Sequence, residues 1–461
     1  MTGQQLQEST VYDNCVGDEF VAPPPLPSKG SKPDYPKTLK VHINSREDCD
    51  AFARLLRQQL SSDKTYLTFE KVGKAKRDRC RFDEKRQDPL KRSKSHQQRE
   101  ETKLWGQTTE FSNDPIPPYI TFAVMFAAER AYVRFARLLK QSLGMTTQYV
   151  YFPAVEAAEQ QTRFWVSKFA DHQPHYPIYV VSKGRADTRY TVRTLEKMNV
   201  PYRVLVEPQD WRAYKAVIDP KKLLVAPFSN HGDGPGRARN YVWDHAISEG
   251  HAAHWVMDDN IDGFFHLNDN RRIRACDGGM FRVMEDFFDR FENLYIAGPQ
   301  YRFFCSPKSG YPPFVLNTRI YSCLLIRNDC RHRWRGRYNE DTDLSLRVLK
   351  DGDCTLQWNA FLQGKLATQQ LGGGNTAEFY HAEFVDDPTE IENGKTHAAG
   401  TYLKSKMLVD MHPDVAALVE RYGRWHHHVD YSGFKHNKLC FKSGRESLER
   451  SYDFELMDFN T

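Results

Sequence analysis

The sequence lacks the features that mark membrane, secreted and zinc-ribbon proteins. It contains no run of about 18 apolar residues, so no membrane-spanning helix and no membrane partner are expected. Its beginning, Met1-Thr-Gly-Gln-Gln, has no basic stretch followed by apolar residues, and no secretory signal peptide is expected. None of the nine cysteines forms a C-x-x-C pair, which argues against zinc-ribbon and thioredoxin-like sites. An odd number of cysteines at irregular spacing favours reduced thiols in a cytosol.

A strong charge of one sign is also missing. The net charge is +5, from 65 basic and 60 acidic residues, so only local clusters can indicate a charged partner. The 461 residues, 40% of them hydrophobic and 13% aromatic, are enough for two or three domains with a sizeable core. Residues 1–34 are polar and end in a proline-rich stretch, which predicts a disordered tail. A ligand for a proline-recognising groove is the weaker alternative.

An internal repeat follows the tail. Residues 41–69 align with residues 124–152 at an offset of 83, and ten of the 29 aligned positions are identical. Each copy reads as strand, amphipathic helix and strand, because Phe52, Leu55, Leu56 and Leu60 recur at helical spacing. We therefore expect two small β-α-β modules, at 35–70 and 115–175, that pack on each other or on a larger domain.

The segment between the modules, residues 71–114, is predicted to be a basic linker. Residues 71–99 carry twelve Lys or Arg against four acids and almost no apolar side chain. A mobile solvated linker and an electrostatic contact to a polyanion such as DNA fit this pattern equally well. The candidate DNA-binding residues are Lys74, Lys76, Arg77, Arg79, Arg81 and Arg92.

From residue 176 the pattern changes to alternating strands and helices. Apolar strand-like runs at 178–182, 200–207, 222–227 and 254–257 are separated by segments with helical spacing. This order predicts an α/β domain at 176–440, with a Rossmann-type, mostly parallel sheet and helices on both faces. Ligands of such sheets bind at the carboxyl ends of the strands. Residues 441–461 are expected to be a C-terminal tail.

The strongest chemical signal is a glycine turn, a helix and a strand that ends in two acids. The turn 232–236 precedes a helix at about 238–249, whose free N–H groups favour phosphate. The strand 254–257 leads into Asp258-Asp259-Asn260, whose oxygens suit Mg²⁺ or Mn²⁺ bound together with a diphosphate. The same residues resemble an EF-hand loop, but a strand precedes them where a calcium loop needs a helix. An Asx turn at a strand end remains the purely structural alternative.

A second acidic group stands far along the chain. Glu340-Asp341-Thr342-Asp343 begins a helix, and a carboxylate fixed there can accept a proton as a general base. Simple helix capping is the alternative interpretation. The cluster His426-His427-His428 could supply an imidazole ligand to a cation, or could have no role in ligation.

Together these segments resemble a known group of enzymes. Pro235-Gly-Arg-Ala-Arg-Asn240, Trp255-Val-Met-Asp-Asp-Asn260 and Glu340-Asp-Thr-Asp-Leu-Ser-Leu-Arg347 look like the nucleotide-sugar-dependent glycosyltransferases of the GT-A fold. More closely, residues 177–440 resemble the TET/JBP-associated glycosyltransferases of tailed bacteriophages. The match includes 178–187, 200–209 and Gly423-Arg-Trp-His-His-His-Val-Asp-Tyr431. That family is thought to glycosylate 5-hydroxymethylpyrimidine bases, such as 5-hydroxymethylcytosine, in phage DNA after a TET-type dioxygenase has made them.

The resemblance implies roles for individual residues. Asp341 would be the catalytic base, with Glu340 and Asp343 beside it, and the metal would be held by Asp258, Asp259, Asn260 and His427. The donor, a UDP-sugar, would contact Ser182, Lys183, Gly184, Arg185, Glu207, Gly236, Arg237, Arg239 and Asn240. It also implies a manganese or magnesium ion, inversion at the sugar carbon and DNA hypermodification in the cytoplasm of a bacterium, either phage-encoded or bacterial. Two alternatives stay open: a non-catalytic module that binds modified DNA, and a glycosyltransferase with a protein, lipid or glycan acceptor.

Overall fold

The computed structural model describes residues 37–58, 60, 66–69, 96–106, 108–113, 119–141, 143, 147, 149–152, 163–305, 310–366, 401–421, 424–446 and 452–458. The chain divides into two compact units, of which the first contains both sequence repeats. The second contains Ser95–Ser112, Arg163–Arg302 and Pro312–Thr461. Within the described ranges, no helix combines the length and the apolar character that crossing a bilayer requires.

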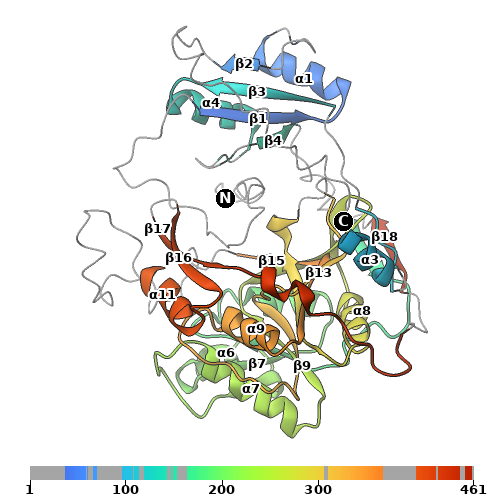
Figure 1. Ribbon diagram of the computed structural model, residues 1–461, viewed down its shortest axis with the longest axis vertical. Helices are drawn as coiled ribbons and strands as arrows, with labels where there is room; N and C mark the ends of the chain where they lie inside the picture. The colour runs from blue at the N-terminus through green and yellow to red at the C-terminus, as the bar shows by residue number, and fades with distance from the viewer. Residues whose placement is uncertain are drawn as a thin grey trace. The chain divides into compact units, whose positions relative to one another are not determined.

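In its described residues the first unit is a four-stranded sheet with two helices (Figure 1). The strand order is β2-β3-β1-β4, with β1 and β3 antiparallel at the centre. Strand β2 pairs in parallel with β3, and β4 pairs in parallel with β1, so each repeat gives its second strand to the first strand of the other. The elements are β1 (Lys37–Ile43), α1 (Arg46–Leu56), β2 (Tyr66–Phe69), β3 (Ile120–Phe126), α4 (Glu129–Leu139) and β4 (Tyr149–Phe152).

An internal two-fold relation connects the repeats. At the centre of the β1–β3 pair Lys40 lies opposite Ala123, two positions that differ by the repeat offset of 83. The helices end on left-handed residues at equivalent positions, Arg57 with φ 52° and Lys140 with φ 54°. Phe52 and Phe135, one from each helix, have ring centroids 6.4 Å apart in a shared core. The predicted repeat is confirmed, and the exchange of strands explains how two units too small to fold alone bury their apolar faces.

The second unit is built on a twelve-stranded mixed sheet of order β18-β5-β11-β10-β15-β12-β14-β9-β6-β7-β8, with β13 paired to β15. One of its parallel parts consists of β6 (Ile178–Val181), β7 (Arg203–Val206), β8 (Leu223–Val225) and β9 (Ala253–Asp258). The other strands are β5 (Arg163–Ser167), β10 (Ile261–Asn268), β11 (Arg271–Ala275), β12 (Leu294–Tyr301), β13 (Phe314–Leu316), β14 (Cys323–Arg327), β15 (Cys354–Lys365) and β18 (Phe454–Asp458).

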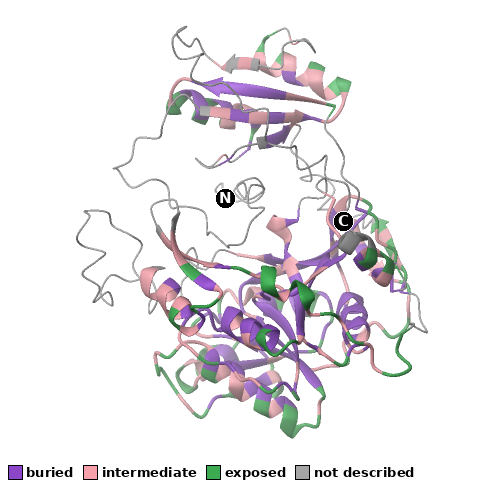
Figure 2. Cartoon of the chain, in the orientation of Figure 1, coloured by how far each residue is buried: buried purple, intermediate pink, exposed green. Residues whose placement is uncertain are grey.

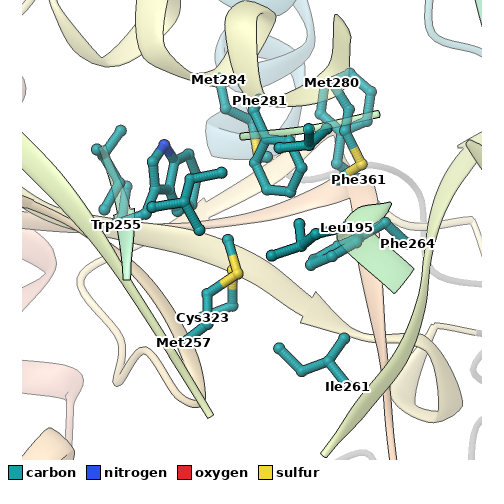
Figure 3. Close-up of a cluster of buried hydrophobic side chains, with 14 of the residues drawn as sticks. Leu195, Trp255, Met257, Ile261, Phe264, Met280, Phe281, Met284, Cys323 and Phe361 are labelled. Carbon is teal, nitrogen blue, oxygen red and sulfur yellow. The ribbon is translucent and has the colours of Figure 1, made fainter. Parts of the chain in front are cut away.

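Helices cover both faces of this sheet. Trp255 and Met257 of β9 point into one core, together with α5 (Tyr190–Lys197) and α8 (Gly279–Phe288), as Figure 3 shows. Val256, between them, points into a second core with α7 (Gly236–Ser248) and α9 (Glu340–Lys350). Successive side chains of a strand alternate between the faces, so a strand covered on both sides is apolar throughout. Figure 2 shows the central strands as buried.

The α/β class with helices on both faces is therefore confirmed. The sheet is mixed, however, because antiparallel strands follow the β-α series. Strand β14 enters antiparallel beside β9, and β10 turns back antiparallel to β15. The predicted parallel arrangement holds for the part formed by β8, β7, β6 and β9.

Two segments expected to be linker or tail contain ordered elements of the second unit. Helix α3 (His96–Trp105), inside the predicted linker 71–114, buries Trp105 against Phe287 with ring centroids 5.1 Å apart. Strand β18, inside the predicted tail 441–461, pairs with β5. Strand β5, expected in the second small module, likewise belongs to the large sheet. The proline-rich tail and the six predicted DNA-binding residues of 74–92 lie outside the described residues.

A smaller substructure and helix α6 are the other parts of the second unit among its described residues. Helix α11 (Thr401–Met411) packs on a two-stranded sheet of β16 (Ala416–Arg421) and β17 (Arg424–Val429). Helix α6 (Trp211–Lys215) follows β7.

Because β6, β7 and β9 are parallel, their carboxyl ends lie along one edge of the sheet. Strand β14 begins at this edge, since Cys323 lies opposite Met257. Strand β15 reaches it too, since Lys365 lies opposite Ile261. This edge is the place where the fold gathers the predicted functional residues.

Candidate active site

Asp258 is the last residue of β9 and lies at the centre of the site. Its Oδ1 accepts a hydrogen bond from Arg239 Nη2 at 2.8 Å, and its Oδ2 contacts Lys365 Nζ directly. Burial alone would raise the pKa of this carboxyl, but Lys365 and Arg239 hold it well below its usual range. Asp258 is therefore ionised and is paired with two cationic side chains.

Asp259 turns inward and holds the loop after β6. Its Oδ1 accepts a hydrogen bond from Arg185 Nη1 at 2.5 Å, and its Oδ2 accepts one from Ser182 Oγ at 2.6 Å. The same loop is fixed by Tyr214, whose hydroxyl accepts from the Arg185 backbone N–H at 3.0 Å. Desolvation raises the pKa of Asp259, which is nearly inaccessible to solvent. Three of the residues predicted to contact the donor or the metal thus form one buried cluster.

The loop after β6 also contacts the end of β7. Gly184, with φ 63°, donates its backbone N–H to Asp210 Oδ2 at 2.9 Å. Lys183 Nζ lies 3.7 Å from Glu207 Oε2, and both side chains are partly exposed. Lys183, Gly184 and Glu207 therefore line one polar rim at the carboxyl ends of two adjacent strands, and Ser182 belongs to the buried cluster around Asp259.

Helix α7 brings one of its two predicted arginines to the site. Arg239 is buried and bridges Asp258 to Glu340, whose Oε1 lies 2.7 Å from Nη1. Arg237 instead is exposed and pairs with Asp233 one turn away. Residues two positions apart on a helix point about 200° apart, so both cannot face the same ligand.

The remaining residues of this turn position the chain. Asn240 clamps the backbone of Trp334, donating to its carbonyl at 2.9 Å and accepting from its N–H at 3.0 Å. Gly234, with φ 85°, packs so closely on Arg337 that a Cβ would lie 2.4 Å from that carbonyl oxygen. This contact ties the start of α7, where Gly236 stands, to the segment that leads into α9.

The first turn of α9 carries Asp341 in the environment of a base. Burial and the neighbouring Glu340 raise the pKa of Asp341 to about 7, although Arg239 opposes the rise and the Thr342 N–H donates to its Oδ1 at 2.8 Å. Asp258 adds to the rise, which means that Asp341 lies within electrostatic range of it. A carboxyl with a pKa near neutrality exchanges protons readily at physiological pH.

Asp343, predicted beside Asp341, has a different position. It is fully buried and bonded to Arg335, Arg347 and His412. These partners hold its pKa below the usual range although burial opposes them. Asp343 therefore fixes α9 to its surroundings, and its geometry does not support the catalytic role expected from the sequence.

Several residues at the site were not identified from the sequence. Ser322, just before β14, has φ 61°, and a hydrogen bond of 2.6 Å from the Cys323 N–H to the Tyr321 carbonyl closes a tight turn around it. Its hydroxyl lies 2.7 Å from the Tyr301 hydroxyl and 2.5 Å from Lys365 Nζ. In the sequence these residues are marked only by being polar side chains next to apolar strand-like runs. They come together because the sheet places their strands side by side.

The acid pair does not fit a divalent cation. All four carboxylate oxygens of Asp258 and Asp259 already contact Arg, Lys or Ser donors. Asn260 Oδ1 is buried without a hydrogen-bond partner, but one neutral oxygen is not a site for Mg²⁺ or Mn²⁺. Nowhere in the described residues do three His, Cys, Asp or Glu side chains converge to hold a metal ion.

His427, the fourth predicted metal ligand, lies in β17 opposite Leu418. Burial, and then the cationic side chains of Arg319 and Lys404, lower its pKa to about 3. The imidazole is neutral, but two neighbouring positive charges disfavour a cation there. The predicted metal set is therefore not assembled in this structure.

Comparison with known proteins identifies part of the chain. Residues 176–374 match the family model described as TET-Associated Glycosyltransferase, a range that contains the predicted donor-binding residues, Asp258, Asp259, Asn260 and the first turn of α9, but not His412 or His427. No curated protein matches the sequence. One similar solved structure is that of a Desulfovibrio desulfuricans protein provisionally named a nucleotide-diphospho-sugar transferase. It shares 14% identity with a TM-score of 0.25, over 52% of this chain and 97% of that one, and this likeness adds nothing to the family match. Residues 176–374 thus form a domain of the TET-associated glycosyltransferase family, and the protein is a glycosyltransferase.

Proposed function

We propose that the protein transfers a sugar from a UDP-sugar to the hydroxymethyl group of 5-hydroxymethylpyrimidine bases in DNA. The observation that carries the proposal is Asp341, a carboxyl with its pKa raised to about 7 at the same sheet edge as Arg239 and the loop 182–185. The sequence resemblance and the family description, which names a TET association, support DNA as the acceptor.

The proposed reaction is a single displacement. The oxygen of the hydroxymethyl group attacks the anomeric carbon and passes its proton to Asp341. The bond between that carbon and the diphosphate oxygen breaks, and the electron pair leaves with the nucleoside diphosphate. One displacement inverts the configuration at the anomeric carbon. No step passes through a metal ion, because Asp258 and Asp259 are occupied by Arg, Lys and Ser partners.

The donor would lie along the carboxyl ends of β6, β7 and β9. Lys183, Gly184 and Glu207 form the polar rim that would contact the nucleoside, and Ser182 would act by holding this loop on Asp259. Arg239 would face the diphosphate, since it projects from the first turn of α7. Arg185 would act indirectly, by fixing this loop through Asp259.

The acceptor would have to leave the base stack. In duplex DNA the hydroxymethyl group lies in the major groove, and we propose that it reaches Asp341 when the base is extruded or the strand is single. The basic segment 71–99 is our candidate for holding the phosphates. A TET-type dioxygenase would supply the hydroxymethyl group, and the cytoplasm of a bacterium would be the setting.

The test uses the purified chain, hydroxymethylated DNA and a panel of nucleotide sugars. DNA made with 5-hydroxymethylcytosine or 5-hydroxymethyluracil, single-stranded or duplex, is digested after the reaction and its nucleosides are weighed by mass spectrometry. We expect a mass gain of one sugar on the hydroxymethylated nucleoside and none on unmodified DNA. Transfer to a protein or glycan acceptor, with every DNA unchanged, would refute the acceptor assignment and leave the glycosyltransferase assignment intact.

A further inference from the structure

We propose that Lys365 and Arg239 together supply the positive charge that binds the donor's diphosphate, so that the transfer needs no divalent cation. This inference rests on the proposed function, because it assumes a nucleoside-diphosphate donor at the carboxyl edge of the sheet. It concerns the place where the sequence alone predicts a metal ion.

Lys365 reaches Asp258 through the sheet. It is the last residue of β15 and lies opposite Ile261 of β10. Ile261 follows Asp258 by three residues in the chain. Its side chain is only 9% exposed, and its Nζ contacts Asp258 Oδ2. The Lys365 ammonium therefore contacts a carboxylate oxygen of Asp258 that a metal ion at this site would be expected to bind.

The ammonium is held from a second side by Ser322. The Ser322 hydroxyl lies 2.5 Å from Lys365 Nζ and 2.7 Å from the Tyr301 hydroxyl. Ser322 has φ 61°, a left-handed backbone conformation that is unfavourable for a residue other than glycine and is typical of functional sites. The unfavourable backbone conformation therefore occurs at the residue whose hydroxyl contacts the Lys365 ammonium.

The two cationic side chains differ in how many carboxylates they are paired with. Arg239 is shared between Asp258 and Glu340. Lys365, among the described residues, is paired with one carboxylate only. A diphosphate brings additional negative charge, and an ammonium that donates to Asp258 and Ser322 still has one proton to donate to it. A divalent cation would instead have to displace Lys365 from Asp258 and lie close to two like charges.

In the reaction the two side chains act on the leaving group. As the bond between the anomeric carbon and the diphosphate oxygen breaks, the departing oxygen gains the electron pair. Lys365 and Arg239 stabilise that charge while both stay protonated. The acceptor's proton goes to Asp341, so no proton has to come from Lys365.

Binding of nucleoside diphosphates tests the inference without any acceptor. The full-length chain is treated with a chelator, and binding of UDP, GDP, ADP, CDP and dTDP is measured by calorimetry with and without added Mn²⁺. Binding of Mn²⁺ alone is followed by electron paramagnetic resonance. We expect one nucleotide to bind with the same affinity under both conditions, and the protein alone to leave the Mn²⁺ signal unchanged.

The variants are Lys365→Met, Lys365→Arg and, as a matched control, Lys168→Met, which removes an exposed lysine paired with Glu455. Lys365→Met should weaken binding by about tenfold or more, because a charge-assisted hydrogen bond is lost. Lys365→Arg should retain most of the affinity, and circular dichroism shows whether each variant is folded. The control should bind like the wild type.

Two results would overturn the inference. One is binding that disappears in chelator and returns with Mn²⁺; the other is a folded Lys365→Met variant with unchanged affinity. Either result leaves the proposed sugar transfer standing. Failure of every nucleoside diphosphate to bind under any condition contradicts the donor assignment itself.

Discussion

Replacing Asp341 by asparagine separates the chemistry of the site from its stability. Asparagine keeps the shape of the side chain and cannot take a proton from the acceptor. General-base catalysis contributes about 10²–10⁴-fold, so Asp341→Asn should lower kcat by that factor. In the wild type only the carboxylate form acts as a base, so kcat should rise about tenfold per pH unit up to about pH 7, the pKa of Asp341, and level off above it.

The same substitution should stabilise the protein at alkaline pH. The pKa of Asp341 is raised from 3.8 to about 7, so the fold favours the protonated carboxyl and disfavours the ionised one. At about 1.36 kcal/mol per pH unit, this difference amounts to about 4 kcal/mol. That figure is an upper bound, since Asp341 is partly accessible to solvent. The stability that the wild type has below pH 3.8 is lost as the pH rises toward 7 and stays lost above it.

Urea unfolding and steady-state kinetics measure both effects. Asp341→Asn should be about 1–4 kcal/mol more stable than the wild type at pH 8, with the difference shrinking as the pH falls from 7 to 5. Its residual activity should no longer rise with pH. An inactive variant that is less stable than the wild type at pH 8 would refute the argument, because Asp341 would then be a favourable structural carboxylate.

Three further predictions concern residues whose positions differ from the sequence expectation. Trp105→Ala should cost about 3–5 kcal/mol of stability in urea unfolding, because its ring is buried in the core of the large unit; an effect below about 1 kcal/mol would mean that α3 is not part of that core. Asp343→Asn should lower stability by about 3–5 kcal/mol, since it leaves buried cationic partners unpaired, and a stable but inactive variant would restore its catalytic role. Arg237→Ala should keep its donor KM within about twofold and change stability by no more than about 1 kcal/mol, because its partner Asp233 is exposed, whereas a large rise in KM would show that Arg237 reaches the donor.

Local patterns in the sequence predicted much of the large domain. The alternation of apolar runs and helical spacing gives the β-α series correctly, and the strand that ends in Asp258 lies at the carboxyl edge as expected. Sequence spacing could also have separated Arg239 from Arg237, and Asp341 from Asp343. Members of each pair stand two positions apart on a helix and point in different directions.

Non-local pairing was not predictable in the same way. Lys365 lies 107 residues from Asp258, and only the register of β15 against β10 brings it to the site. The exchange of strands between the repeats is a similar case, because each repeat alone is equally compatible with pairing its own strands. Helix α3 belongs to the large unit because Trp105 is buried there. The charged residues around Trp105 indicate an exposed segment, so the sequence did not predict this packing.

The balance between sugar transferred and nucleoside diphosphate released tests the central claim most directly. Chelator-treated protein is incubated with hydroxymethylated DNA and the preferred nucleotide sugar, and both products are counted in the same sample. The account predicts one diphosphate for every sugar found on a hydroxymethylated nucleoside, and about a hundredfold or more slower formation of both products with Asp341→Asn. Diphosphate release without sugar on the DNA, or full transfer by the Asp341→Asn variant, would contradict it.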